Sequence, residues 1–205
     1  MSLLTLTEVG KSYRRTPALR PVSLDLEPGE LVALAGPSGS GKSTLLMIAG
    51  GWETPDTGVV TPHPPLPDRP MAEQQWDHVG FVPQSIGLFE ELSITDNLVF
   101  PARNRQDRTD VTKLLETLDL AKFAGRRPAR ISRGEQQRVA VARALVTAPA
   151  LVLADEPTSH QDRAHAELVL TSLRAAADAG ATVLVASHDP LLTQHADRTI
   201  TLAGA

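Results

Sequence analysis

The chain has 205 residues, of which 41% are hydrophobic and 21% are charged, values typical of one folded globular domain. Its formal net charge of −4 argues against a general nucleic-acid binder, so we expect no nucleic-acid partner, and the lack of cysteine excludes disulfides and thiolate metal sites. No signal peptide is visible and no apolar run approaches the roughly 20 residues that span a bilayer, so we expect any membrane role to depend on a partner.

Two kinds of strand are predicted along the chain. Residues 3–9 and 22–27 alternate between apolar and polar side chains, and we expect them to pair antiparallel. Three later runs are continuously apolar, as is typical of parallel strands covered by helices; they span 31–36, 151–156 and 182–187. A helical stretch follows each of these runs, near 42–50, 162–179 and 190–196. This strand–helix order predicts an α/β fold.

Two segments interrupt that order. Residues 61–70, "TPHPPLPDRP", hold five prolines and predict a stiff connection that is incompatible with a strand. Residues 93–148 contain helical patterns and no predicted strand. We therefore expect a single domain over 1–205 with a helical subdomain, about 90–148, inserted within it.

The first buried strand runs into "GPSGSGKST", residues 36–44, which fits the pattern G-x-x-x-x-G-K-[ST]. Glycines let successive backbone N–H groups turn towards phosphate oxygens, and the following helix adds its positive N-terminal end. We expect Lys42 to reach the β- and γ-phosphates of a nucleotide and Ser43 to bind Mg²⁺. A chance glycine-rich turn is the alternative, which the strand before and the helix after disfavour. The predicted nucleotide-binding residues are Gly36, Pro37, Ser38, Gly39, Ser40, Gly41, Lys42, Ser43 and Thr44.

Polar residues also end the other two buried strands, at the edge of a parallel sheet where ligands bind. Asp155 and Glu156 could form a solvated turn, but beside a phosphate loop Asp155 suits the Mg²⁺ shell and Glu156 suits activation of the attacking water. Pro157 disfavours the helical region for Glu156, which predicts an extended backbone there. His188 ends the third strand, where its side chain could bond the γ-phosphate. No chemistry is assigned to the other histidines, His63, His78, His160, His165 and His195.

A second candidate anion site lies at "ISRGE", residues 131–135. Ser132 and Glu135 fit an S-x-x-E capping box, which begins a helix. The same N-terminus offers free N–H groups and a favourable dipole to an anion. The residues alone therefore leave open whether this turn only starts a helix or also binds a ligand.

Taken in order, these motifs resemble the ATP-binding subunit of ABC (ATP-binding cassette) transporters over essentially the whole chain. The resemblance implies a P-loop NTPase fold of ABC type, with a mostly parallel core sheet and helices, an N-terminal antiparallel β portion and an inserted helical subdomain. It also implies ATP and Mg²⁺ as cofactors and ATP hydrolysis as the activity.

Further motifs gain a role only through this resemblance. Gln84 in "VGFVPQ" is similar to the family's Q-loop glutamine, which implies catalytic and Mg²⁺ contacts, and Tyr13 is placed like the aromatic residue that stacks on adenine. Residues 131–135 are similar to the signature loop that binds the γ-phosphate of ATP held on a second subunit. There Ser132 would donate its hydroxyl and Gly134 its backbone N–H, with Glu135 beside them.

Two departures from the family pattern stand out. Arg133 replaces the usual first signature glycine, and we expect it either to point away from the nucleotide or to add positive potential near it. In "SHQD", residues 159–162, Ser159 and Asp162 match the ends of the family's D-loop, and Asp162 is expected at the nucleotide. His160 and Gln161 replace D-loop residues that are usually apolar.

The resemblance predicts a head-to-tail pair of cassettes, a second copy of this chain being the expected partner, with two ATP molecules at the seam. The pair would drive separate transmembrane permease subunits from the cytoplasmic face of the membrane, docked through the region around Gln84. The finer resemblance is to the lipoprotein-release and macrolide-export branch, in which some members transmit mechanical work without moving a solute. Two hypotheses therefore remain open: a transport ATPase, or an ATPase that drives an extracytoplasmic partner. The sequence names neither the substrate, nor its direction, nor the permease.

Overall fold

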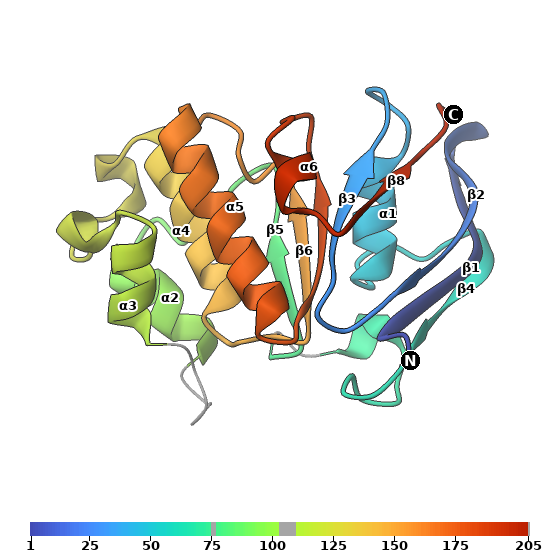
Figure 1. Cartoon of the computed structure of the whole chain (residues 1–205), viewed down its shortest axis with the longest axis horizontal. Coiled ribbons are helices and arrows are strands. Elements are labelled where there is room, and N and C mark those ends of the chain that lie inside the picture. The colour runs from blue at the N-terminus through green and yellow to red at the C-terminus, as the bar shows by residue number, and fades with distance from the viewer. Residues whose placement is uncertain (75–76, 103–109, 205) are drawn as a thin grey trace.

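The structure is a computed structural model that describes residues 1–74, 77–102 and 110–204. At the centre of this part of the chain is a five-stranded parallel sheet in the order β5-β6-β7-β3-β8 (Figure 1). Its strands are β3 (Leu31–Ala35), β5 (Val79–Val82), β6 (Leu151–Asp155), β7 (Thr182–Ala186) and β8 (Arg198–Thr201). The three buried strands predicted from apolar runs are all present, each within about one residue of its predicted end.

A second sheet is antiparallel and has the order β2-β1-β4. It consists of β1 (Leu4–Tyr13), β2 (Thr16–Leu26) and β4 (Thr57–Pro62). The predicted antiparallel pairing of the first two strands is confirmed. The prediction that 61–70 is incompatible with a strand is wrong at its first two residues, because β4 ends at Pro62. This strand lies at the edge of the sheet, where a residue without an N–H is tolerated.

Helices cover both faces of the parallel sheet, which explains why its strands are continuously apolar. Helix α1 (Lys42–Ala49) lies between the two sheets, and α4 (Arg133–Leu145) and α5 (Arg163–Asp178) cover the opposite face (Figure 1). Alternate residues of β3 pack into different cores, since successive side chains of a strand point to opposite faces. Leu31 and Ala33 belong to the core with α4 and α5, whereas Val32 and Leu34 pack with α1.

Among its described residues, the segment between β5 and β6 contains helices joined by loops and no strand. It contains α2 (Ile94–Ala102), α3 (Val111–Thr117), two short 3-10 helices, η2 (Ala121–Phe123) and η3 (Pro128–Arg130), and α4. Residues 103–109, which fall within the predicted helical subdomain, lie outside the described part. Figure 1 shows α2 and α3 at the end of the molecule opposite the antiparallel sheet. A further 3-10 helix, η1 (Met71–Glu73), connects the two sheets.

The C-terminal part differs most from prediction. The helix expected at 190–196 is reduced to the single turn α6 (Leu192–His195), and β8 was not predicted. Most side chains of β8 are exposed because it is an edge strand, so it lacks the apolar signal of the central strands. Its position is fixed by Asp197, whose Oδ2 accepts hydrogen bonds from the backbone N–H of Leu31 (2.8 Å) and from Arg174 Nη1 (2.6 Å).

Candidate functional site

The loop between β3 and α1 has the backbone that a phosphate-binding loop requires. Gly41, which precedes the first residue of α1, has a φ of 94°, in the left-handed region that favours glycine. A Cβ at this position would lie 2.4 Å from the carbonyl oxygen of Ala18 in β2. Glycine is therefore needed at this end of the motif both for backbone conformation and for close contact with the antiparallel sheet.

The lysine of the same motif is folded back over its own loop. Lys42 is only 8% exposed, and its Nζ donates hydrogen bonds to the carbonyl oxygens of Gly36 (2.8 Å) and Pro37 (3.1 Å). These two acceptors hold a cation at the mouth of the loop. An incoming phosphate oxygen would offer Lys42 a stronger, charged partner.

A pocket of about 480 Å³ gathers most of the residues predicted at the phosphates. The predicted site residues that line it are Tyr13, Ser38, Gly39, Gly41, Lys42, Ser43, Thr44, Gln84, Asp155, Glu156 and His188. Gly36, Pro37 and Ser40 belong to the same loop but do not line the pocket. The sheet explains the convergence, because β3, β5, β6 and β7 are parallel and their carboxyl ends lie at one edge.

The acidic pair at the end of β6 meets the end of β7. Asp155 is buried and lies opposite Ala186 in the parallel register, so Glu156 comes beside Ser187 and His188. Glu156 Oε2 accepts hydrogen bonds from Ser187 Oγ (3.1 Å) and from the backbone N–H of His188 (3.4 Å). His188 Nε2 lies 3.7 Å from Glu156 Oε1. The contact between Ser187 and this carboxylate was not predicted from the sequence.

The backbone of Glu156 corrects one prediction. We expected an extended conformation before Pro157, but Glu156 has a φ of 50°, in the left-handed region. The chain reverses sharply here: the Glu156 N–H bonds the Ala186 carbonyl (2.8 Å), and the Glu156 carbonyl accepts from the Ser159 N–H (3.1 Å). The proline does exclude the right-handed helical region, but the turn needs a strained conformation of the kind found at functional sites.

Tyr13 lies at the end of β1 on the rim of this pocket, with 47% of its surface exposed. Its hydroxyl donates a hydrogen bond to Glu53 Oε2 (3.1 Å), and Lys11 Nζ lies 5.6 Å from its ring centre. Partial burial, followed by the hydrogen bond to Glu53, raises the pKa of Tyr13 above its ordinary value. Lys11 also forms an ion pair with Glu53 (2.8 Å). Neither Lys11 nor Glu53 was predicted near the site; Glu53 lies 40 residues along the chain from Tyr13, which gives no local signal.

The predicted capping box is present at the start of α4. The Glu135 N–H bonds Ser132 Oγ (3.3 Å), and Glu135 Oε2 accepts from the Ser132 N–H (2.7 Å). These residues line a second pocket of about 400 Å³. Its walls are Asp119, Lys122, Ser132, Arg133, Gly134, Glu135, Arg138, His160, Gln161, Asp162 and His165.

The two glycine positions of the signature turn are not equivalent. Arg133, at the first position, is exposed in the open second pocket. At the second position a Cβ on Gly134 would lie 2.7 Å from the carbonyl oxygen of His160. The structure therefore explains why an arginine is accommodated at 133 while glycine is retained at 134.

Asp162 caps the N-terminus of α5 and lines the same second pocket. Its Oδ1 accepts from the backbone N–H of His165 (2.9 Å) and lies 2.9 Å from His165 Nδ1. The backbone bond first, and the His165 ring second, hold the pKa of Asp162 below its ordinary value. His165 was given no role from sequence, yet it is a direct neighbour of the D-loop carboxylate.

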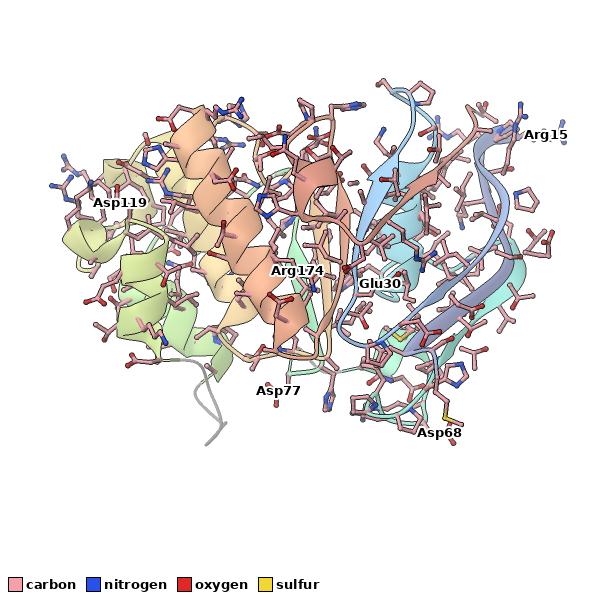
Figure 2. All side chains as sticks on the ribbon, viewed as in Figure 1. Arg15, Glu30, Asp68, Asp77, Asp119 and Arg174 are labelled. Carbon is pink, nitrogen blue, oxygen red and sulfur yellow. The ribbon has the colours of Figure 1, made fainter. Side chains whose placement is uncertain are left out.

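The predicted nucleotide-binding residues are thus divided between two pockets that have no lining residue in common. Figure 2 labels Asp119, a residue of the second pocket, and Arg15, which is close in sequence to Tyr13 of the first pocket. Asp119 is at the helical end, whereas Arg15 is at the far end of the antiparallel sheet. Within one chain the structure does not bring the signature turn to the phosphate loop.

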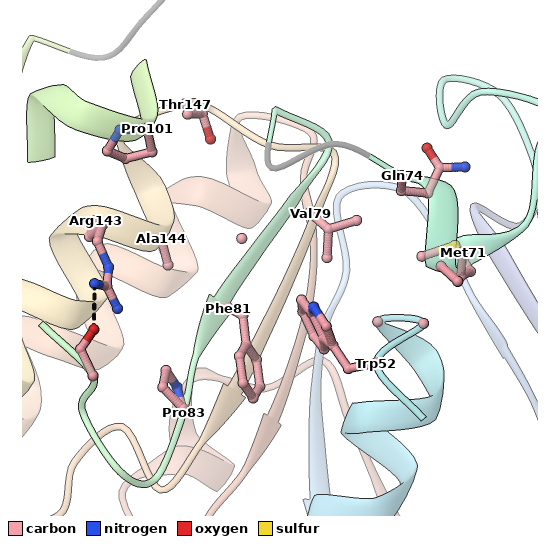
Figure 3. Close-up of a pocket in the computed structure, with 15 residues that line it drawn as sticks. Trp52, Met71, Gln74, Val79, Phe81, Pro83, Pro101, Arg143, Ala144 and Thr147 are labelled. Carbon is pink, nitrogen blue, oxygen red and sulfur yellow. Dashed lines mark hydrogen bonds between the residues drawn. The ribbon is translucent and has the colours of Figure 1, made fainter. Parts of the chain in front are cut away.

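A third hollow, of about 260 Å³, lies beside β5 and is also lined by Trp52, Gly87 and Arg143 (Figure 3). Trp52 and Phe81 stack in it with ring centres 4.4 Å apart, and Arg143 Nη1 donates to the Gly87 carbonyl (2.7 Å). Burial lowers the pKa of Arg143. Aromatic surface continues nearby at Phe89 and Phe100, which are 40% and 43% exposed with ring centres 5.1 Å apart. In the described ranges, no helix combines the length and the apolar character needed to cross a membrane.

Comparisons with known proteins agree with this geometry. The profile of the ABC transporter family matches residues 19–159. The chain is 41% identical, over its full length and 97% of the relative, to the lipoprotein-releasing system ATP-binding protein LolD of Myxococcus xanthus. It is 35% identical to the ABC transporter ATP-binding protein YvrO of Bacillus subtilis, over 97% of this chain and 92% of the relative.

Solved structures give the same answer. The dimeric post-hydrolysis structure of the ATP-binding cassette MJ0796 with ADP and Pi superposes with a TM-score of 0.85 at 31% identity, over 97% of this chain and 94% of that one. With the family profile and the relatives, this likeness identifies the fold and the activity. The chain belongs to the ABC transporter family and is an ATP-binding subunit that hydrolyses ATP.

Proposed function

We propose that two copies of this chain close head to tail around two ATP molecules and drive a separate transmembrane permease. The division of the nucleotide-binding motifs between two pockets supports this proposal most directly. Each ATP would be held by the phosphate loop of one copy and by the signature turn of the other. Residues 1–205 would act as one ATPase domain, with the helical region about 90–148 inserted in it.

In the phosphate pocket, the adenine base would stack on Tyr13, and the β- and γ-phosphates would lie on the N-terminus of α1. The N–H groups of residues 36–44 would bind the phosphate oxygens, with Thr44 at the first turn of the helix. Lys42 would exchange its two carbonyl partners for phosphate oxygens.

The same pocket suits Mg²⁺. Ser43 and Asp155 would contribute oxygen ligands, and Gln84 would offer its amide oxygen. In proteins, Mg²⁺ is usually held by one or two carboxylates together with substrate phosphates. Among the described residues there is no cluster of three or more acidic, histidine or cysteine side chains, as an all-protein metal site would need. Mg²⁺ bound with ATP would neutralise charge that develops on the phosphates.

Hydrolysis requires a water molecule in line with the γ-phosphorus. We assign Glu156 to accept a proton from that water as the water oxygen bonds to the γ-phosphorus. The bond between the γ-phosphorus and the β-phosphate oxygen breaks in the same reaction, which releases ADP and phosphate. Ser187 donates a hydrogen bond to the Glu156 carboxylate, and His188, which lies beside that carboxylate, would donate one to the γ-phosphate. Gln84 would complete the arrangement from the end of β5.

At the seam, Ser132 and Gly134 of the second copy would donate hydrogen bonds to the γ-phosphate. Glu135 would keep the turn in its capped form, and Asp162 would face the nucleotide from the start of α5. ATP would favour closure because the signature turn gains these contacts only when the γ-phosphate is present. Hydrolysis would remove that bridge and release the seam.

The third hollow, beside β5, is the surface we assign to the permease. Its aromatic lining and the neighbouring Phe89 and Phe100 leave apolar surface that a helix of a membrane partner would cover. The relatives named as lipoprotein-releasing system proteins favour transport over mechanical work without a solute. The chain would then sit at the cytoplasmic face of the membrane, attached through the permease.

A mixing experiment tests the shared site. The phosphate-loop variant Lys42→Ala and the signature variant Ser132→Arg should each be almost inactive alone. Mixed together, they should recover a measurable part of the wild-type rate of phosphate release, because a mixed dimer contains one site with both motifs intact. If each ATP were bound within a single chain, the mixture would stay inactive.

The matched control combines Lys42→Ala with Glu156→Gln. Both changes lie in the phosphate pocket, so each site of a mixed dimer carries one defect. This mixture should show no recovery. Recovery in both mixtures would instead indicate activity that does not depend on the shared arrangement.

A further inference from the structure

Gln161, one of the two departures in the D-loop, joins this loop to the signature helix. Its Nε2 donates a hydrogen bond to the carbonyl oxygen of Gly134 (2.8 Å), and its Oε1 accepts one from Arg138 Nη1 (2.9 Å). The two partners fix the direction of the amide, since the guanidinium of Arg138 only donates and the carbonyl of Gly134 only accepts. An apolar residue at this position would make neither bond.

The bonds of Gln161 belong to a longer chain of contacts. Arg138 is only 4% exposed, and its Nε donates to the carbonyl oxygen of Leu118, just after α3. On the other side, the His160 carbonyl approaches Gly134 so closely that a Cβ there would clash. The helical region, the signature turn and the D-loop are therefore tied together at one point.

We propose that Gln161 is a positioning residue that sets the signature turn at a fixed distance from Asp162, so that both meet the partner subunit as one preformed surface. This inference rests on the proposed head-to-tail function. Pre-ordering removes part of the conformational entropy that closure would otherwise cost. Gln161 does not line the phosphate pocket, so it should affect closure of the dimer and leave nucleotide binding by one chain unchanged.

The variant Gln161→Leu tests this, because leucine has a similar size and makes neither bond. We would place it in a Glu156→Gln chain, which should accumulate as the closed dimer, and measure the ATP-driven dimer dissociation constant by sedimentation. We expect dimerisation about tenfold weaker, as for the loss of one or two hydrogen bonds. The affinity for a fluorescent ADP analogue, which reports the phosphate pocket alone, should not change.

Gln136→Leu is the matched control. The Gln136 Nε2 also donates to loop carbonyls, those of Pro128 (2.9 Å) and Ile131 (3.4 Å), from the same helix but without touching the D-loop. It should weaken dimerisation clearly less than Gln161→Leu. Equal effects would mean that any loosening of α4 suffices, and an unchanged constant in Gln161→Leu would mean that the D-loop link has no role; either result overturns the inference.

The parent chain separates this inference from the proposed function. If Glu156→Gln alone fails to dimerise with ATP, the head-to-tail proposal fails, and the role of Gln161 fails with it. If the parent dimerises and the two leucine variants match it, only the inference about Gln161 is overturned.

Discussion

The phosphate pocket and the signature pocket differ in what holds their functional groups in place. In the phosphate pocket, Asp155 ends a buried strand, and Glu156 and His188 come just after the ends of two buried strands, so the core of the protein sets their spacing. In the signature pocket, Ser132 and Asp162 are the N-cap residues of two helices, and their positions depend on capping bonds and on loop contacts.

The two pockets also differ in how ready their groups are for a ligand. Lys42 must leave two carbonyl partners within its own loop, whereas the signature turn is already ordered by its capping box. Under the proposed function, the first pocket would bind a nucleotide by itself, and the second would add contacts to a nucleotide that another chain presents. The residues proposed for hydrolysis thus lie at the ends of buried strands, whereas those proposed to meet the partner lie at helix ends held by loop contacts.

The largest expected effect concerns Glu156 in the phosphate pocket. Glu156→Gln should lower steady-state phosphate release by about 10²–10⁴-fold, the usual contribution of a general base. ADP binding should be retained, since the amide occupies the same space and the phosphate loop is unchanged. Near-normal turnover would refute the assigned base and would place the proton acceptor elsewhere in the pocket.

The second prediction compares the two positions of the signature turn. Gly134→Ala puts a methyl group against the His160 carbonyl, and overpacking of this kind costs about 1–3 kcal/mol. Turnover should therefore fall by about tenfold to a hundredfold if the turn cannot adjust. ADP affinity, which reports the other pocket, should stay at the wild-type value.

Arg133→Gly is the neighbouring control and restores the residue usual in the family. Because Arg133 is exposed, its replacement should change turnover by no more than about threefold, as for most surface substitutions. A many-fold gain would show that the native signature turn is impaired. A loss as large as that of Gly134→Ala would show that the guanidinium itself contributes to function.

The third prediction compares Ser40 of the phosphate loop with Ser132 of the signature turn, and it measures the free energy of unfolding in urea. Ser132→Ala removes the cap of α4 and should destabilise the chain by about 1 kcal/mol. Ser40→Ala should be neutral or slightly stabilising, because Ser40 is 1% exposed and its hydroxyl has no hydrogen-bond partner among the described residues. Equal losses in the free energy of unfolding would mean that the phosphate loop and the signature turn depend on their serine hydroxyls to the same degree.

The sequence predicted the phosphate pocket well because its signals are local. Each buried strand is a continuous apolar run, and each leads directly into its polar residues, so the order of the chain already gives the edge of the sheet. The capping box at Ser132 is local in the same sense. The roles of these residues in binding and hydrolysis remain predictions that the experiments above test.

The sequence predicted less where the structure depends on distant partners. Edge strands β4 and β8 expose most of their side chains and carry no apolar run. The left-handed backbone of Glu156 follows from a bond to β7, which no local pattern encodes. The contact between Gln161 and Gly134 joins residues on two different elements, so Gln161 could be noticed as a departure but not assigned a partner.

The smallest expected effect concerns the electrostatics of the signature pocket. The His165 backbone N–H and ring hold the pKa of Asp162 below its ordinary value, which is about 3.9 for aspartate. Stability from this carboxylate is thus present above the ordinary pKa and is lost as the pH falls through the lowered value. In His165→Ala the backbone bond remains, so an NMR titration of the side-chain carboxyl should show the Asp162 pKa rising only part of the way. Asp197, whose lowered pKa depends on Leu31 and Arg174, should not move. A full return of Asp162 to its ordinary value would mean that the ring, and not the helix cap, orders the D-loop.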